Sequence, residues 1–340
     1  MIFLFFDDKL KKKSERFEAV ILQKGEKMVN EKKERLNGNG VFIKKNNFKN
    51  WDLYLMVMPV IIYFFVFSYM PMYGVQIAFK DFNVSQGIWG SKWVGLKYFI
   101  RFFNDYQFKR LIGNTLKISF TSILFGFPTP IIFALMLNEI RNERYKRFVQ
   151  TVTYAPHFIS MVVMVGMIIS FLSPSSGMIN IFRTKLGLEP IYFMAEPKYF
   201  IMIYVLSGIW QGTGWNSIIY LSALSSIGQE LHEAARVDGA SRFQRLWHIN
   251  IPGILPTIVI MLIMQAGNVM SVGFEKVFLL QNDVNREASD VISTYVYRMG
   301  ILGGQYSFSS AVGLFNSVIN VTLLLIVNKI SKKLSDTSLW

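Results

Sequence analysis

Six long stretches of this 340-residue sequence contain no Asp, Glu, Lys or Arg, and this feature restricts the fold more than any other. A bilayer core about 30 Å thick requires roughly 20 apolar residues of helix. Each stretch is long enough, although several also include turn residues that must lie outside a helix. The sequence therefore predicts an all-α integral membrane protein with about six spans, at residues 53–72, 114–138, 151–172, 200–224, 253–274 and 306–328.

The composition excludes most soluble proteins and several kinds of catalytic site. Hydrophobic residues make up 52% of the chain, charged residues 17%, and the mean hydropathy is +0.33. Six helices buried in a soluble core are therefore a poor alternative. Because the chain has no Cys, thiolate catalysis and Cys-ligated zinc are excluded. No two of the three His residues share a helical turn, so we expect neither a catalytic residue nor a metal site.

The net charge of +14 is concentrated at the N-terminus, where 13 of the 36 basic residues precede Trp51. Charge in a tail does not form a groove for nucleic acid, so nucleic-acid binding is not expected. Residues 1–50 are rich in Lys, Glu and Asn and lack a sustained hydrophobic period. We expect a basic, mostly disordered cytoplasmic tail that lies against the anionic headgroups of the lipid bilayer.

The basic residues between the spans predict the orientation of the chain in the membrane. Residues 1–50 and 328–340 and the loops at 139–150 and 225–252 hold 23 of them, whereas the other three loops hold 11. The positive-inside rule places the side richer in Lys and Arg in the cytoplasm. We therefore expect a multi-pass protein whose N-terminus and C-terminal tail, residues 331–340, are both cytoplasmic.

The loop at residues 225–252, between the fourth and fifth predicted spans, has the pattern of a helix, a turn and a second helix. Ser226 and Gln229 have the spacing of a capping box for the first helix. Gly239 suits the left-handed backbone position that ends a helix. A second capping box, at residues 241 and 244, precedes the second helix. The loop therefore predicts a small polar lobe that suits docking into a groove of a partner protein.

The same loop carries a pattern that resembles a known family. Glu-Ala-Ala at 233–235 is followed after three residues by Gly239, after nine more by Ile249, and after one more by Ile251-Pro252. This is similar to the EAA loop of permease subunits of binding-protein-dependent ABC importers, in which Leu stands at the position of Ile251. The resemblance covers residues 51–330 and implies a transmembrane permease domain with the type I importer fold.

The resemblance implies a set of partners in a bacterial inner membrane. A second, different permease subunit would complete the path, two cytoplasmic ATPase subunits would drive it, and an extracytoplasmic binding protein would deliver the substrate. This chain has no Gly-x-x-x-x-Gly-Lys-Ser/Thr phosphate loop, so we expect it to have no ATPase site. ATP and Mg²⁺ would then be used by the partner subunits, and this chain would bind no cofactor.

Within the coupling loop, the resemblance assigns roles to individual residues. Glu233 would pair with a basic group of the ATPase, and the small residues would allow a close fit. Asp238 has two open roles, bracing the turn or contacting the partner. Ile249 and Pro252 are expected to hold the loop against the spans. The coupling residues are thus Glu233, Ala234, Ala235, Asp238, Gly239, Ile249 and Pro252.

Two further stretches resemble the carbohydrate-uptake branch of these importers, of the maltose-transporter permease type. One is Trp-Val-Gly-Leu-Lys-Tyr at 93–98. The other is Trp-Gln-Gly-Thr-Gly-Trp at 210–215, which is similar to permeases for oligosaccharides or polysaccharide fragments. The resemblance therefore implies a carbohydrate as the substrate.

Polar and aromatic side chains within the spans are candidates for lining a sugar path, because such groups are costly in lipid unless they face a cavity or another helix. Aromatic faces cover the apolar faces of sugars, and amides pair with hydroxyls. Packing and hydrogen bonding between helices remain the alternative for each. Glu275 and Lys276 are expected to form a local ion pair, so no cation is expected in the path. The candidates are Gln211, Trp215, Asn216 and Tyr220 in the fourth span and Gln265 and Asn268 in the fifth.

Three alternative functions remain. An ABC importer for a polyamine or peptide would keep the same coupling loop, because that loop indicates an ATPase partner and does not indicate the transported substrate. An ion-coupled secondary transporter would need ionisable groups near the bilayer midplane, which are not evident. A membrane enzyme would need clustered acidic residues, whereas Asp81, Asp105, Asp283 and Asp290 lie singly in the sequence.

Overall fold

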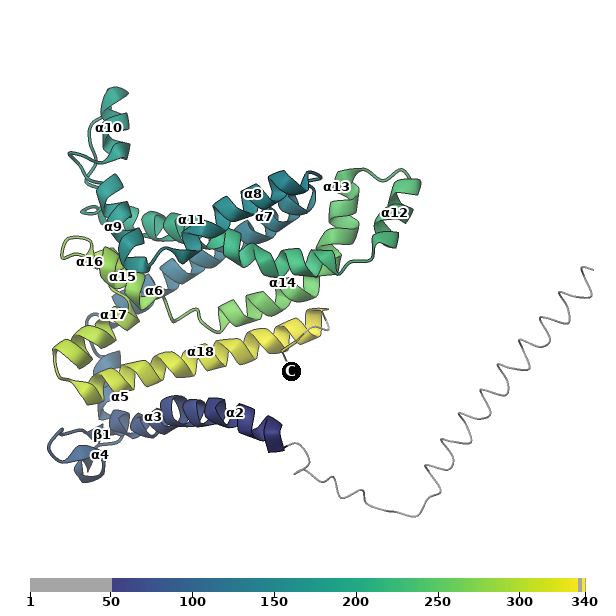
Figure 1. The fold of residues 1–340 in the computed structure, drawn as a ribbon. Coiled ribbons are helices and arrows are strands. Elements are labelled where there is room, and N and C mark those ends of the chain that lie inside the picture. The colour runs from purple at the N-terminus through teal and green to yellow at the C-terminus, as the bar shows by residue number, and fades with distance from the viewer. Residues whose placement is uncertain (1–50, 336–337, 340) are drawn as a thin grey trace, which may run out of the picture. The chain divides into compact units, whose positions relative to one another are not determined.

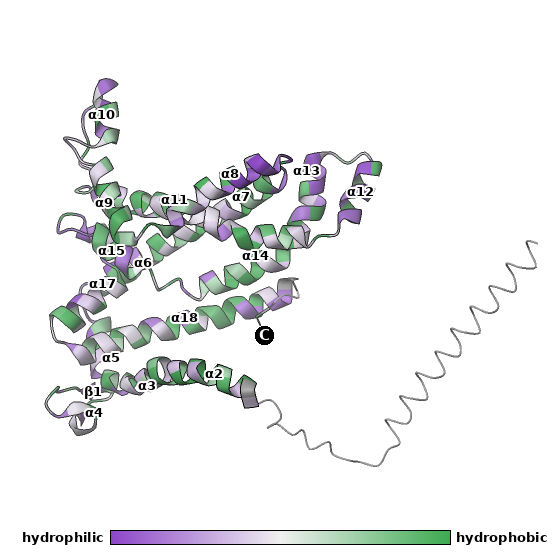
Figure 2. Ribbon diagram, viewed as in Figure 1, coloured by the Kyte–Doolittle hydropathy of each residue, from purple (hydrophilic) through white to green (hydrophobic). Residues whose placement is uncertain are grey.

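The computed structural model describes residues 51–335 and 338–339, and helices predominate in them (Figure 1). The predicted tail at residues 1–50 lies outside this part. The described chain divides after Met70 into two units, the first of residues 51–70 and the second from Pro71 onward. In the first unit, α2 (Trp51–Phe64) continues into a π-helical turn (Phe65–Tyr69), and most residues of this helix are hydrophobic (Figure 2). Their large apolar side chains are exposed. Such an apolar surface is typical of a helix in contact with lipid.

Four helical segments of the described chain are long and apolar enough to cross a membrane: Leu53–Phe79, Phe108–Asn138, Arg242–Ala266 and Tyr306–Lys333. They correspond to the first, second, fifth and sixth predicted spans, so the all-α membrane class is confirmed. The first segment continues from α2 through α3 (Met70–Met72) and a 3₁₀ turn (Tyr73–Phe79). The second consists of α6 (Phe108–Thr121), a π-helical turn (Ser122–Gly126) and α7 (Pro128–Asn138). The third consists of α13 (Arg242–Arg245), a π-helical turn (Leu246–Asn250) and α14 (Ile251–Ala266), and the fourth lies in α18 (Tyr306–Ser335).

The third predicted span, 151–172, is wrong as one continuous helix. The chain instead forms α8 (Glu143–Tyr154), a 3₁₀ turn (Ala155–Phe158) and α9 (Met161–Phe171), with a bend of 98° between the two limbs. Ser160 has an extended backbone and its hydroxyl accepts a hydrogen bond from the amide of Val163 at 3.4 Å. This side-chain cap starts a new helix in a new direction, because it satisfies an amide that the first helix would otherwise have bonded.

The fourth predicted span is a single helix, α11 (Pro197–Ser225), but it is less apolar than the others. Its 29 residues are ample for a bilayer. Gln, Gly, Thr and Asn interrupt its middle, at residues 211–216, and it does not reach the apolarity of the four segments above. Among the described residues, length and apolarity together support four spans, or five with the bent pair, where the sequence predicted six.

Two predicted ends are also corrected. The fifth span was expected to reach residue 274, but α14 ends at Ala266, and residues 267–273 form turns before α15 (Phe274–Leu280). The sixth was expected to end at residue 328, yet α18 continues to Ser335 and so includes the first part of the predicted C-terminal tail. Leu, Ile and Val at residues 323–327 precede Lys329, Lys332 and Lys333, which suit the C-terminal end of a helix dipole.

Short elements connect the long helices. β1 (Lys80–Asp81) and β2 (Lys92–Trp93) form an antiparallel pair in which Lys80 lies opposite Trp93. The other connecting helices are α4 (Gly87–Gly90), α5 (Lys97–Phe103), α10 (Met178–Lys185), α16 (Arg286–Ser289) and α17 (Ile292–Tyr297), which continues into a π-helical turn (Arg298–Leu302).

Three apolar clusters hold the second unit together, and α11 contributes to two of them. Near its start, Phe200 and Ile203 pack with residues of α9 and α15. Near its end, Tyr220 and Leu224 pack with residues of α7 and α14. The third cluster joins α5, α6, α17 and α18. Because lipid is as apolar as these side chains, close packing rather than exclusion of water drives such helix association.

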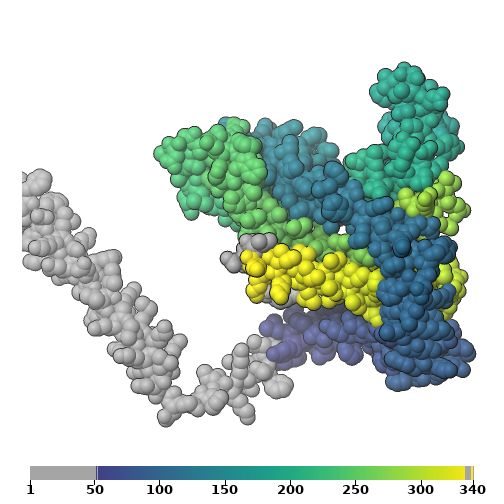
Figure 3. All heavy atoms as spheres, turned by 180° about the vertical axis from the view of Figure 1, so that it is seen from behind, coloured from purple at the N-terminus to yellow at the C-terminus, as the bar shows by residue number. Residues whose placement is uncertain are grey.

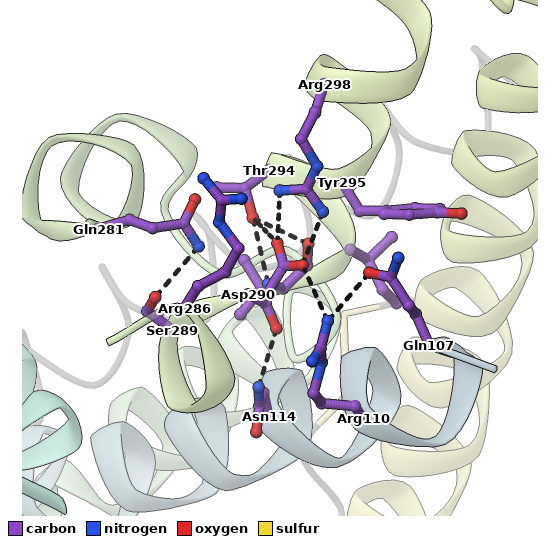
Figure 4. A network of polar contacts seen from close by, with 12 residues as sticks. Gln107, Arg110, Asn114, Gln281, Arg286, Ser289, Asp290, Thr294, Tyr295 and Arg298 are labelled. Carbon is purple, nitrogen blue, oxygen red and sulfur yellow. Dashed lines mark hydrogen bonds and ion pairs between the residues drawn. The ribbon is translucent and has the colours of Figure 1, made fainter. Parts of the chain in front are cut away.

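One buried carboxylate joins α6 to the segment between α16 and α17 (Figure 4). The side chain of Asp290 has no exposed surface and accepts two hydrogen bonds from Arg298, at 3.1 and 2.7 Å. Thr294 donates a third at 3.1 Å, and Arg110 of α6 forms an ion pair at 3.7 Å. The amide of Asn114 donates to the backbone carbonyl of Asp290 at 3.0 Å. Sequence patterns do not reveal this network, because Arg110 and Asn114 lie far from Asp290 in the chain.

Candidate functional site

The predicted coupling loop forms a separate lobe of two helices, α12 (Gln229–Val237) and α13 (Arg242–Arg245). The lobe projects from one end of the second unit in the space-filling view (Figure 3). Its surface is more hydrophilic than that of the long helices (Figure 2). The predicted helix, turn and helix are therefore confirmed.

Gly239 makes the turn between the two helices, as predicted. Its φ is +76°, the left-handed region that side chains with a Cβ rarely adopt. The amide of Gly239 donates to the carbonyl of Arg236 at 3.1 Å, and the amide of Ala240 donates to the carbonyl of Ala235 at 2.8 Å. This pair of bonds is a Schellman motif, which satisfies carbonyls left free at the end of α12.

One of the two predicted capping boxes is confirmed. The amide of Gln244 donates to the Ser241 hydroxyl at 3.3 Å, and the Gln244 side chain accepts from the amide of Ser241 at 2.7 Å. The box at Ser226 is wrong. Ser226 still has helical backbone angles at the end of α11, and its hydroxyl donates to the carbonyl of Ala223 at 2.7 Å, so α12 begins after Gly228 without a side-chain cap.

The coupling residues occupy different parts of this lobe. Glu233, Ala234 and Asp238 are exposed, and Ala235 is half-buried. Within the described part of the chain, the carboxylates of Glu233 and Asp238 have no hydrogen-bond or ion-pair partner. Their charges are therefore available to a partner protein.

The base of the lobe joins α14 through the π-helical turn at Leu246–Asn250. Ile249 is half-buried within this turn, and Pro252 occupies the first turn of α14, where a missing amide proton costs little. A Cβ at Gly253 would lie 2.5 Å from Cδ1 of Ile227. Glycine at 253, which the sequence analysis did not single out, thus lets the two ends of the loop approach closely.

Large apolar side chains on the lobe are exposed, which the sequence analysis did not predict. Val237 is 88% exposed, and Leu231, Phe243 and Trp247 are more than half exposed. The rings of Phe243 and Trp247 meet edge to face, with centroids 6.2 Å apart. Apolar groups beside free carboxylates are typical of a docking surface.

A cavity with both polar and apolar side chains in its lining lies among the π-helical turn of the second span, α11 and the end of α14. It consists of two adjoining pockets of about 180 and 230 Å³, which share Ser122, Tyr204 and Gln265. Asn268 lines the first pocket and Asn216 the second. Three of the six predicted path residues are thus brought to one cavity.

The other three predicted path residues lie elsewhere. The amide of Gln211 donates to the carbonyl of Ile159 at 3.1 Å, and Trp215 stacks on His157 with centroids 4.4 Å apart. Both contacts join α11 to the bend between α8 and α9. Tyr220 is 2% exposed and belongs to the apolar cluster with α7 and α14.

Lys276 of α15 also lines the second pocket, which corrects the expected ion pair with Glu275. Its ammonium donates to the carbonyl of Tyr204 at 2.6 Å and lies 4.4 Å from the centre of the Tyr204 ring. None of the ion pairs among the described residues includes Lys276. Lys276 was expected near the end of the fifth span, but that span ends at Ala266, and the irregular segment at 267–273 brings the cation back against α11.

No group of three or more His, Asp or Glu side chains in the described part of the chain could hold a metal ion. The polar groups in the lining of the cavity are hydroxyl, amide and ammonium groups, which can bind and orient polar molecules beside its apolar side chains.

Comparisons with known proteins agree with these features. Residues 126–336 match the family described as "Binding-protein-dependent transport system inner membrane component". Protein LplB of Bacillus subtilis is 45% identical over 288 residues, which cover 85% of this chain and 91% of that protein. The polygalacturonan/rhamnogalacturonan transport system permease YteP of the same organism is 42% identical over 288 residues, which cover 85% of this chain and 90% of that protein.

A solved structure has the same fold. It is a chain of a bacterial ABC transporter involved in the import of the acidic polysaccharide alginate, with a TM-score of 0.78 and 43% identity. The match covers 84% of this chain and 96% of that one. The helices of this chain thus form the type I permease fold expected from its coupling loop. The chain belongs to the family of inner membrane components of binding-protein-dependent transport systems.

Proposed function

We propose that this chain is the transmembrane subunit of an ATP-driven importer for a carbohydrate, an oligosaccharide or polysaccharide fragment. The observation that carries this proposal is the cavity with polar side chains in its lining, among helices that are otherwise apolar enough to cross a membrane. Amide and hydroxyl groups within such helices bind a hydroxylated solute in place of water. The names of the relatives, a polygalacturonan/rhamnogalacturonan permease and an alginate importer, support this class of substrate.

The lobe is the proposed contact with the ATPase subunits. Glu233 and Asp238 have no partner within the described residues, so each is free to meet a basic group of an ATPase. Val237 and Phe243 provide apolar surface for the same contact. In this arrangement Ala234, Ala235 and Gly239 keep the turn narrow, while Ile249 and Pro252 connect it rigidly to α14. Movement of the ATPase would then be passed directly to the fifth span.

The remaining parts of the transporter are supplied by partners. A sister permease completes the path, a binding protein outside the cell delivers the carbohydrate, and two ATPase subunits bind ATP and Mg²⁺. This chain then has no enzymatic activity and no cofactor of its own. Its two termini and the lobe lie in the cytoplasm of a bacterial cell, in keeping with the distribution of basic residues.

The test is the ATPase activity of the reconstituted complex, in which this chain is combined with its sister permease, the ATPase subunits and the binding protein. The binding protein is offered oligosaccharides, polyamines and peptides in turn. Stimulation by an oligosaccharide alone is expected. Stimulation only by a polyamine or peptide would keep the transport mechanism and overturn the carbohydrate assignment.

The coupling role is tested separately by Glu233→Ala. We expect normal insertion of the variant into the membrane, together with loss of the bound ATPase or of substrate-stimulated ATP hydrolysis. Glu230→Ala is the matched control, because Glu230 is exposed on the same helix, one turn earlier and outside the motif. Normal ATPase association and uptake in Glu233→Ala would contradict the assignment.

A further inference from the structure

Lys276 is a buried cation without a counter-ion. It is 6% exposed, and no carboxylate among the described residues pairs with it. Removing an ammonium from water is costly unless an anion or several hydrogen bonds compensate. The carbonyl of Tyr204 accepts one of its three protons, and the Tyr204 ring adds a cation–π contact. The cation is therefore held in place but not neutralised.

Lys276 belongs to the wall of the second pocket. Gly208 of α11 also lines the second pocket, and a Cβ at this position would lie 3.1 Å from Nζ of Lys276. Any larger residue at 208 would press against the ammonium. Glycine at 208 therefore lets the ammonium lie against α11 at the wall of the second pocket.

A second group in the cavity also lacks a partner. The hydroxyl oxygen of Ser122 is fully buried and has no hydrogen bond, although buried hydroxyls are normally bonded. Ser122 lines both pockets and begins the π-helical turn in the second span. Such turns occur often at functional sites. Asn216 and Gln265 add amide groups to the lining of the same cavity.

We infer that this cavity binds the acidic unit of a sugar chain, with the carboxylate of a uronic acid beside Nζ of Lys276. The hydroxyls of the sugar ring pair with Ser122, Asn216 and Gln265. This inference rests on the proposed carbohydrate function and narrows it to acidic oligosaccharides. A neutral sugar would satisfy the hydroxyl and the amides but would leave the ammonium without a counter-ion.

The experiment measures uptake of digalacturonate, a neutral disaccharide and a sugar phosphate by the complete transporter in proteoliposomes, with the binding protein present. Lys276→Gln removes the charge, and Lys276→Arg keeps it. The matched control is Lys117→Gln, since Lys117 is an exposed cation of α6 that does not line the cavity. Co-purification of the sister permease and the ATPase subunits shows that each variant is assembled.

We expect Lys276→Gln to lower digalacturonate uptake about tenfold or more, as befits the loss of a charge-assisted hydrogen bond. Lys276→Arg and Lys117→Gln should retain most of the uptake. Equal losses in Lys276→Gln and Lys276→Arg would indicate packing and overturn the inference, as would unchanged uptake in Lys276→Gln. A wild-type complex that takes up only the neutral sugar or the sugar phosphate also overturns it and leaves the carbohydrate proposal standing. A complex that responds to no carbohydrate overturns both.

Discussion

Asp290 and Arg298 are joined by two hydrogen bonds between one carboxylate and one guanidinium, of 3.1 and 2.7 Å (Figure 4). The carboxylate has no exposed surface, and the guanidinium side chain is 27% exposed. A buried pair of this kind gains little over an apolar pair, but removal of one partner leaves an uncompensated charge. The pair therefore joins the residues that flank α17, while Arg110 and Asn114 of α6 bond to the same Asp290 and hold this segment against α6.

The variant Asp290→Asn should destabilise the protein, because it leaves Arg298 and Arg110 beside a neutral amide. We expect a loss of at least about 2 kcal/mol in the free energy of unfolding, seen as a lower melting temperature of the solubilised complex. Asp283→Asn is the control, since Asp283 pairs with Arg286 on the surface and exposed pairs contribute little. Equal melting temperatures for the two variants would show that the buried network does not stabilise the fold.

The variant Gly239→Pro should uncouple transport from ATP hydrolysis without preventing membrane insertion. Proline fixes φ near −65°, whereas Gly239 has a φ of +76° and donates its amide proton to Arg236. Gly239→Ala should have a smaller effect, since a Cβ in the left-handed region costs about 1–2 kcal/mol. The measurement is co-purification of the ATPase with the permease. Gly113→Ala, at a position with open space and an ordinary φ, serves as the control and should bind the ATPase normally.

The coupling lobe was largely predictable because its signals are local. Gly239 and the Ser241 capping box act on bonds within a few residues, so their spacing is sufficient to predict the turn and the second helix. Ser226 has the same spacing to Gln229 but lies in the last turn of α11, and the pattern alone does not show that the preceding helix continues that far.

The bend and the cavity were not predictable in the same way. Residues 151–172 contain no Asp, Glu, Lys or Arg, and mean hydropathy does not show that Ser160 caps a new helix within them. The place of Lys276 beside Tyr204 depends on a contact across 72 positions of the chain. The neighbouring residue Glu275 was the expected partner of Lys276, but in the folded chain the ammonium contacts Tyr204 instead.

Alanine variants in the cavity should lower transport without lowering the yield of the complex. Asn216→Ala and Gln265→Ala remove amides that line the second pocket, so each should reduce carbohydrate uptake severalfold. Tyr220→Phe is the control, because this ring lies in an apolar cluster and not in either pocket. Uptake by proteoliposomes, normalised to assembled complex, is the measurement. Unchanged uptake in both alanine variants would show that these amides serve helix packing and do not bind the substrate.

The crossing of the membrane by α11 is testable because the natural sequence has no Cys, so a single introduced thiol is the only reactive one. Leu186, before α11, is 63% exposed, and Val237, in the lobe after it, is 88% exposed. If α11 crosses the bilayer despite its polar middle, Leu186→Cys should react with an impermeant maleimide in intact cells. Val237→Cys should react only after the cells are permeabilised. Tyr106→Cys, in a loop predicted to face outward, should behave like Leu186→Cys, and the parent chain should not react. Labelling of both Leu186→Cys and Val237→Cys from the same side would mean that α11 does not cross, since one traverse must separate its two ends.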